Sequence, residues 1–289
     1  MLLSTQTEIL SQEKGIFKTV EELKSVGFDA YDLSFFDMPF ETSAFHTDDY
    51  LKNAQKLRKF ADEIGIKCNQ AHAPFPSHSE TDENWNKLVK SYIIRSLEVA
   101  SVAGAKVCVV HPFNDWNAER NAEELYLPLK EYAERFNIKI GVENMWNWED
   151  LPYPDGRATP AACSSPEDFI KHMEKLPEEN FVACLDIGHA EMFKEFCAAD
   201  FIYALKGRLH ALHVHDNDCY RDLHYFPYMG TINYERIFEA LAKIGYDDDF
   251  TFEANYTLNR YPHSMQHELL KLLADTGRVM IEKISQAKR

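Results

Sequence analysis

The chain of 289 residues carries 47 acidic and 31 basic side chains, a formal net charge of −16 at pH 7. This balance argues against broad binding to nucleic acid or to an anionic membrane surface, because a phosphate-binding face needs lysine and arginine. No segment approaches the ~20 apolar residues of a membrane span, while 45% hydrophobic residues allow a large core. Residues 1–14 lack a signal-peptide pattern and the six cysteines form no Cys-x-x-Cys pair, so we expect a reduced, cytoplasmic protein.

One local pattern recurs along the chain: a helical stretch ends in glycine and an apolar strand follows at once. Gly27, Gly65, Gly104 and Gly245 occupy this position, and Asn137 takes the same part, because glycine and asparagine tolerate the left-handed backbone that closes a helix. The pattern predicts strands at 2–5, 29–35, 66–73, 106–112, 138–144, 182–187, 209–215 and 249–255. Helices are expected at 16–26, 48–64, 82–103, 119–136, 166–174, 195–205, 233–243 and 264–285.

Eight alternating strand and helix units, without a linker, predict one domain over residues 1–289 that folds as a single (β/α)8 TIM barrel of the α/β class. The first strand is not followed by Gly-x-Gly-x-x-Gly, which argues against a dinucleotide-binding sheet. The longest irregular stretches, 144–164 and 216–232, each follow a strand. Such loops form the active-site face of a barrel.

Six consecutive predicted strands, from the third to the eighth, end in histidine, aspartate or glutamate. The residues at these ends are His72, His111, Glu143, Asp186 with His189, His213 with His215, and Glu253. Side chains alternate between the two faces of a strand, so an inward Glu143 implies an inward Gly141. By the same phase Cys184, Ala211 and Thr251 lie below Asp186, His213 and Glu253. These small neighbours leave room for polar groups at the top of the barrel.

The last four strands predict a metal site. Because neighbouring strands are ~4.8 Å apart, Glu143, Asp186, His213 and Glu253 can converge on one ion. Two glutamates, one aspartate and one histidine suit a divalent cation such as Mn, Zn, Co or Mg, with positions left for substrate oxygens.

These residues resemble the xylose-isomerase-like barrels, a family that includes sugar isomerases and epimerases and the endonuclease-IV-type AP endonucleases. The resemblance runs from about residue 15 to 285, and its carriers are 142–144, 185–189, 213–216 and 252–254. It implies that Glu143, Asp186, His213 and Glu253 bind the catalytic metal. It also implies that His189 and Glu149 contact substrate, as matching residues do in ketose epimerases.

The same residues leave a second interpretation open. Asp222-Leu223-His224 resembles the Asp-Arg-His of the AP endonucleases, and His72, His111 and His189 fit the additional zinc ligands of that group. On the isomerase interpretation His72, His111, Asp222 and His224 contact substrate instead. Trp146, in the loop after the fifth strand, is expected to cover the apolar face of a sugar.

The function predicted from the sequence is a divalent-metal-dependent isomerase or epimerase of a sugar or sugar phosphate, with a small-molecule sugar or polyol as partner. Glu143 and Glu253 would act as acid and base in proton transfer through a metal-stabilised enediolate. The alternatives are an AP endonuclease with a multinuclear zinc site, an inosose-type dehydratase, and a barrel that binds a metabolite without catalysis. The oligomeric state stays open, with a homo-oligomer as one option.

Overall fold

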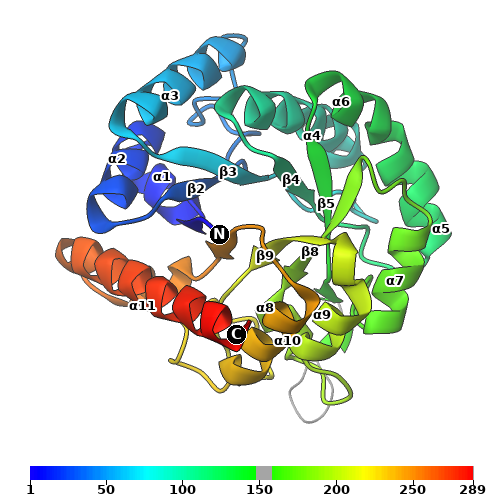
Figure 1. Cartoon of the computed structure of the whole chain (residues 1–289). Coiled ribbons are helices and arrows are strands. Elements are labelled where there is room, and N and C mark those ends of the chain that lie inside the picture. The colour runs from blue at the N-terminus through cyan, green and yellow to red at the C-terminus, as the bar shows by residue number, and fades with distance from the viewer. Residues whose placement is uncertain (148–157, 289) are drawn as a thin grey trace.

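Eight parallel strands close into a barrel in the computed structural model, which describes residues 1–147 and 158–288 (Figure 1). Six strands form one sheet in the order β2-β3-β4-β5-β8-β9, and β1 pairs with β10. Their bounds are β1 Leu3–Thr5, β2 Ala30–Ser34, β3 Lys67–His72, β4 Val107–Val110, β5 Lys139–Glu143, β8 Phe181–Asp186, β9 Leu209–His213 and β10 Phe250–Phe252.

Two short contacts join these sheets into a ring. The amide of Thr7 donates to the carbonyl of Asp32 at 3.0 Å, which ties β1 to β2. The amide of Val214 donates to the carbonyl of Thr251 at 2.9 Å, which ties β9 to β10. The predicted (β/α)8 TIM barrel is therefore confirmed.

Helices surround the strands as an outer ring (Figure 1). Their bounds are α1 Glu8–Lys14, α2 Ile16–Val26, α3 Tyr50–Ile64, α4 Glu83–Ala103, α5 Ala118–Arg120, α6 Lys130–Phe136, α7 Pro166–Glu174, α8 Ile187–Ala190, α9 Ala198–Leu205, α10 Tyr234–Ile244 and α11 Gln266–Ala287. Gly104 follows α4 with φ 107°, and the amide of Ala105 donates back to the carbonyl of Ala100, so the predicted glycine stop is confirmed there. Within the described residues, no helix is long and apolar enough to cross a membrane.

One helix prediction was wrong in detail. The helix expected at 119–136 divides into α5, a π turn at Asn121–Tyr126, a 3₁₀ turn at Leu127–Leu129 and α6. Pro128 has no amide hydrogen and its ring crowds the preceding turn, which breaks the regular ladder. The structure also adds α1, α8 and a two-stranded antiparallel ribbon, β6 Trp146–Asn147 with β7 Thr159–Pro160, which the sequence pattern did not predict.

The inside of the barrel is filled by small side chains, as the strand phase predicts. Val107, Val109, Val182, Cys184 and Ala211 form a separate buried cluster, while Leu185, Leu212 and Phe252 belong to the larger core between sheet and helices. A methyl group on Gly141 would lie 3.1 Å from Val107 Cγ1, a tight contact that Val107 could relieve only by shifting, so this inward position favours glycine. The polar strand ends therefore sit on a packed floor.

Candidate metal centre

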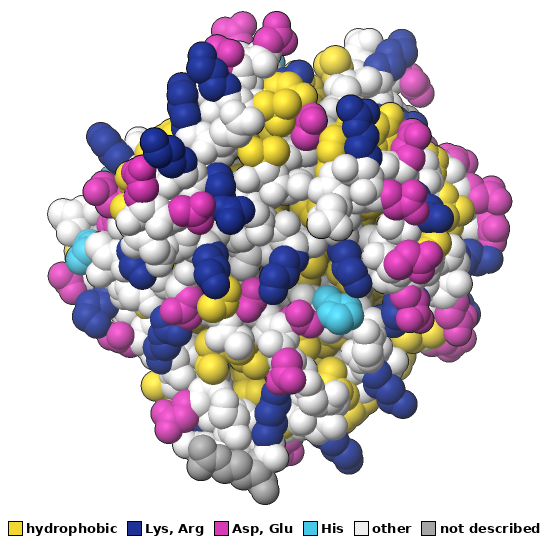
Figure 2. Space-filling view, turned by 45° about the horizontal axis from the view of Figure 1, so that its top comes forward, with side chains coloured by type: hydrophobic (Ala, Val, Ile, Leu, Met, Phe, Trp, Pro, Cys, Tyr) yellow, Lys and Arg dark blue, Asp and Glu magenta, His cyan; other side chains and the backbone are white. Residues whose placement is uncertain are grey.

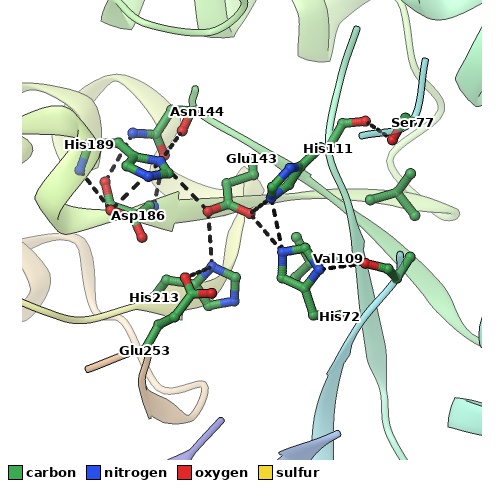
Figure 3. Close-up of polar contacts among 12 residues, drawn as sticks. His72, Ser77, Val109, His111, Glu143, Asn144, Asp186, His189, His213 and Glu253 are labelled. Atoms are coloured by element: carbon green, nitrogen blue, oxygen red, sulfur yellow. Dashed lines mark hydrogen bonds and ion pairs between the residues drawn. The ribbon is translucent and has the colours of Figure 1, made fainter. Parts of the chain in front are cut away.

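Four side chains from neighbouring strands meet at the carboxyl end of the barrel (Figure 3). Glu143, Asp186 and His213 are the last residues of β5, β8 and β9, and Glu253 follows β10 directly. All four are buried, and one ligand atom from each lies within 4.8 Å of the others. His213 Nδ1 is 3.0 Å from Glu143 Oε1 and 3.0 Å from Glu253 Oε2. The structure thus brings together the four predicted ligands.

The electrostatics of this group fit a cation. Burial alone would raise the pKa of the Glu143 carboxyl, but His213 and His111 outweigh it and hold this pKa well below its usual range. Burial likewise opposes ionisation of Glu253, and His213 again lowers that pKa. Asp186 Oδ2 is buried and has no hydrogen-bond partner among the described residues. A divalent ion would satisfy that oxygen and favour the ionised carboxylates.

A second group shares Glu143. The Nε2 atoms of His72 and His111 lie 3.0 Å apart, and they are 3.4 Å and 3.2 Å from Glu143 Oε2. His72 Nδ1 lies 2.8 Å from the carbonyl of Ala73, which keeps the ring proton on Nδ1 and leaves a lone pair on Nε2. Two imidazole nitrogens and a carboxylate oxygen facing one another are ligands for a metal ion or for a shared proton.

A third group lies on the other side of the central four. His224 Nε2 is 3.0 Å from Asp222 Oδ2, and His189 Nε2 is 3.5 Å from the same oxygen. The Nδ1 atoms of both rings face backbone carbonyls, that of Asn144 for His189 and that of Glu253 for His224. Carbonyls that fix the tautomer in this way are typical of the surroundings of metal-binding histidines. The Trp146 indole donates to Asp222 Oδ2 at 3.3 Å, which brings the predicted aromatic to the same place.

These groups open into a cavity of about 270 Å³. Glu143, Glu253, His111, His189, Asp222, His224 and Trp146 line it together with the aromatic rings of Phe36, Phe75 and Tyr256. Among the lining residues that the structure describes, none is lysine or arginine. Glu149, the remaining predicted substrate contact, lies outside the described residues.

The chain resembles known proteins in both sequence and fold. Residues 20–274 match a family described as the xylose isomerase-like TIM barrel. The chain belongs to this family. The uncharacterized protein MJ1311 of Methanocaldococcus jannaschii is 29% identical over 216 residues, which cover 70% of this chain and 69% of that protein.

Solved structures of similar fold extend the comparison. A D-tagatose 3-epimerase-like protein superposes with a TM-score of 0.73 at 23% identity, covering 99% of each chain. The IolI protein, solved with a bound zinc atom, gives 0.73 at 17% identity, covering 99% of each chain. D-psicose 3-epimerase gives 0.72 at 14% identity, covering 97% of this chain and 99% of that one. The structural neighbours of this xylose isomerase-like barrel thus include sugar epimerases.

Sequence reasoning missed three residues of this xylose isomerase-like site. Gln6 and Glu8 line the cavity and follow β1 closely in the chain. The sequence-based prediction used polar residues only at the ends of the third to eighth strands, and including the first strand would have found these two. His215, predicted at the end of the seventh strand but without an assigned role, is buried and joins two groups. Its Nε2 lies 3.0 Å from Asp186 Oδ1, and its ring stacks on that of His224 at 4.1 Å.

Gly188→Ala is expected to displace His215 and disturb this arrangement. An added methyl group would lie 1.9 Å from His215 Cε1, so the ring or the backbone of α8 has to shift, which disturbs the contact of His215 with Asp186. We expect a loss of about 1–3 kcal/mol of stability and about 10- to 100-fold weaker metal binding, read by thermal unfolding and metal titration. Gly207→Ala is the control, because an added methyl group there meets nothing within 4 Å. Equal behaviour of the two variants would contradict the prediction.

The metal-free protein is expected to lose stability as the pH rises from about 6.5 to about 10. Burial lowers the pKa of the His224 imidazole, but the charge and hydrogen bond of Asp222 outweigh it and raise this pKa to about 10. A group whose pKa is higher in the folded than in the unfolded protein contributes its full stabilisation at pH values below the unfolded pKa. This contribution is lost as the pH rises through the folded pKa. Denaturant unfolding of chelator-treated protein measures the slope. Asp222→Asn, which removes the charge, should flatten it, and an unchanged slope in that variant would disprove the assignment.

Proposed function

We propose that this protein is a divalent-metal-dependent isomerase or epimerase that acts on a sugar or polyol. The observation that carries the proposal is the convergence of Glu143, Asp186, His213 and Glu253, of which Glu143 and Glu253 border an aromatic-lined cavity. Hard oxygen ligands and one imidazole suit Mn, Co, Mg or Zn. Phe36, Phe75, Trp146 and Tyr256 offer apolar surface for the carbon face of a sugar, and the carboxylates offer acceptors for its hydroxyl groups.

The residues divide the proposed chemistry between them. A bound cation would supply Lewis-acid stabilisation of the charge that develops on the substrate oxygens. Glu143 and Glu253 both border the cavity, and each has a carboxylate oxygen 3.0 Å from His213 Nδ1. A substrate in the cavity would therefore meet two carboxylates. One removes the proton from the carbon beside the carbonyl and the other returns it. His189, held by Asn144, orients a substrate oxygen.

A specific observation favours a second candidate, an AP endonuclease with a multinuclear zinc site. The groups His72–His111–Glu143 and His189–Asp222–His224 each have the donor types of a zinc site. The net charge of −16 opposes DNA binding. On the face seen in Figure 2, lysine and arginine are interspersed with aspartate and glutamate, without a continuous basic surface.

The test is a screen of ketoses, aldoses and inosose-type substrates with Mn, Co, Mg or Zn in heavy water. We expect deuterium to appear on the carbon beside the carbonyl in a wild-type reaction and not in a reaction with Glu253→Gln. Elimination of water from the substrate, which gives a product lighter by one water molecule, would instead indicate the dehydratase. Abasic-site DNA is incubated in parallel, and its cleavage without any sugar turnover would overturn the proposal in favour of the endonuclease.

A further inference from the structure

Glu8 lines the cavity, but the proposed mechanism assigns no role to its carboxyl group. It is the first residue of α1 and directly follows the turn after β1. That turn is fastened to the centre of the site: Gln6 Nε2 donates to Glu253 Oε1 at 2.6 Å, and Asn255 Nδ2 donates to the carbonyl of Gln6 at 2.8 Å. The backbone that carries Glu8 is therefore fixed relative to Glu253, and its side chain borders the same cavity.

The Glu8 carboxyl has no hydrogen-bond or ion-pair partner among the residues that the structure describes, 1–147 and 158–288, although it is partly buried. Burial, followed by the charge of Glu253, raises the pKa of Glu8 to about 7. The charge of Glu8, after burial, contributes to raising the pKa of Tyr256 to about 12. The charges of His224 and His72 lower the pKa of Glu8, but they do not outweigh burial and the charge of Glu253.

Such an arrangement favours one class of ligand. A partly buried acid without a partner destabilises the free protein, whereas a hydroxyl group of a ligand would remove that cost by hydrogen bonding to it. The helix dipole stabilises an acidic residue in the first turn of any helix. A side chain turned toward solvent gains the same stabilisation, so the dipole does not explain why Glu8 faces the cavity. With Glu8, Asp222 and Glu253 on the wall, and no described lysine or arginine there, a phosphate or carboxylate on the ligand would lie beside several carboxyl groups, with histidine imidazoles as the cationic groups among the described lining residues.

We propose that Glu8 is a specificity residue that binds a hydroxyl group of a neutral, unphosphorylated sugar or polyol and disfavours anionic substrates. This inference rests on the proposed function and narrows its substrate class. Glu8 is assigned contact with the substrate and no part in moving the proton from carbon.

The test compares Glu8→Leu and Glu8→Gln with Glu13→Gln, which removes a carboxylate from the same helix outside the cavity. With a neutral sugar that the wild type turns over, Glu8→Leu should raise KM about 10- to 100-fold and leave kcat within about 3-fold. Glu8→Gln, which keeps a hydrogen-bonding group, should raise KM less and narrow the preference for the neutral sugar over its phosphate ester. Glu13→Gln should match the wild type.

Calorimetric titration of the wild type and Glu8→Leu, with the neutral sugar and with its phosphate ester, gives a readout independent of turnover. Thermal unfolding establishes that each variant is folded. An active wild type with unaltered Glu8 variants, or a wild type that prefers the phosphate ester, would overturn this inference and leave the proposed function standing. A wild type that binds and converts no sugar would overturn both.

Discussion

Glu253→Gln is expected to lower turnover by about 10²- to 10⁴-fold while the protein stays folded and keeps part of its metal. The amide has the size of the carboxyl and an oxygen that can still accept from Gln6 and coordinate an ion, but it cannot take up a proton at neutral pH. The loss should therefore appear in kcat, and the solvent-deuterium label should disappear from the product. Elemental analysis and thermal unfolding separate this outcome from loss of metal or of fold.

His189→Ala is the comparison variant, since it leaves the central four ligands intact. We expect it to weaken substrate binding and to reduce kcat less than Glu253→Gln does, because orientation is shared among several contacts. The opposite ranking would mean that an imidazole moves the proton or that His189 holds a second ion. Metal analysis of His189→Ala separates these two cases, because only the second predicts a lost ion.

Removal of the metal by a chelator is expected to abolish turnover, with a loss of more than about 10³-fold that one equivalent of cation per chain restores. Metal that binds the folded state alone should also stabilise it, by about 2.7 kcal/mol at a hundredfold excess over its Kd. Asp186→Asn should lose this stabilisation, because it weakens a buried ligand whose Oδ2 has no other partner among the described residues.

Asp168→Asn is the matched control for metal content. Asp168 lies in another buried group of metal-ligand residue types, with Cys163 and His172, but its Oδ2 accepts from the amide of Cys163 at 2.7 Å and its carbonyl accepts from His172. Asp168→Asn should leave the number of metal ions bound per chain unchanged. A wild-type content near three zinc ions per chain, lost stepwise in His72, Asp186 and Asp222 variants, would contradict the single-ion site and support the endonuclease.

The sequence by itself determined the alternation of strands and helices, because the signals for it are local. Asn137 ends α6 by taking the left-handed conformation, with φ 52°. Ser165 begins α7, because its Oγ accepts from the amide of Asp168. Each residue acts on a helix end within one turn of its own position. The same local logic brought the four proposed ligands to one end of the barrel: alternation along a strand and the end of that strand decide where Glu143 and Asp186 point.

Only the tertiary structure decided how these groups face one another. His72 and His111 are 39 residues apart in the chain, and Gln6 and Glu253 are 247 apart, so no local pattern encodes their contacts. The carbonyls of Ala73 and Asn144 fix which nitrogen of His72 and His189 faces the site. Barrel closure, which places β1 beside β10, brings Glu8 to the cavity. Such contacts depend on which strands lie side by side in the barrel and in which register. Tertiary packing determines both, and it joins residues that are far apart in the sequence.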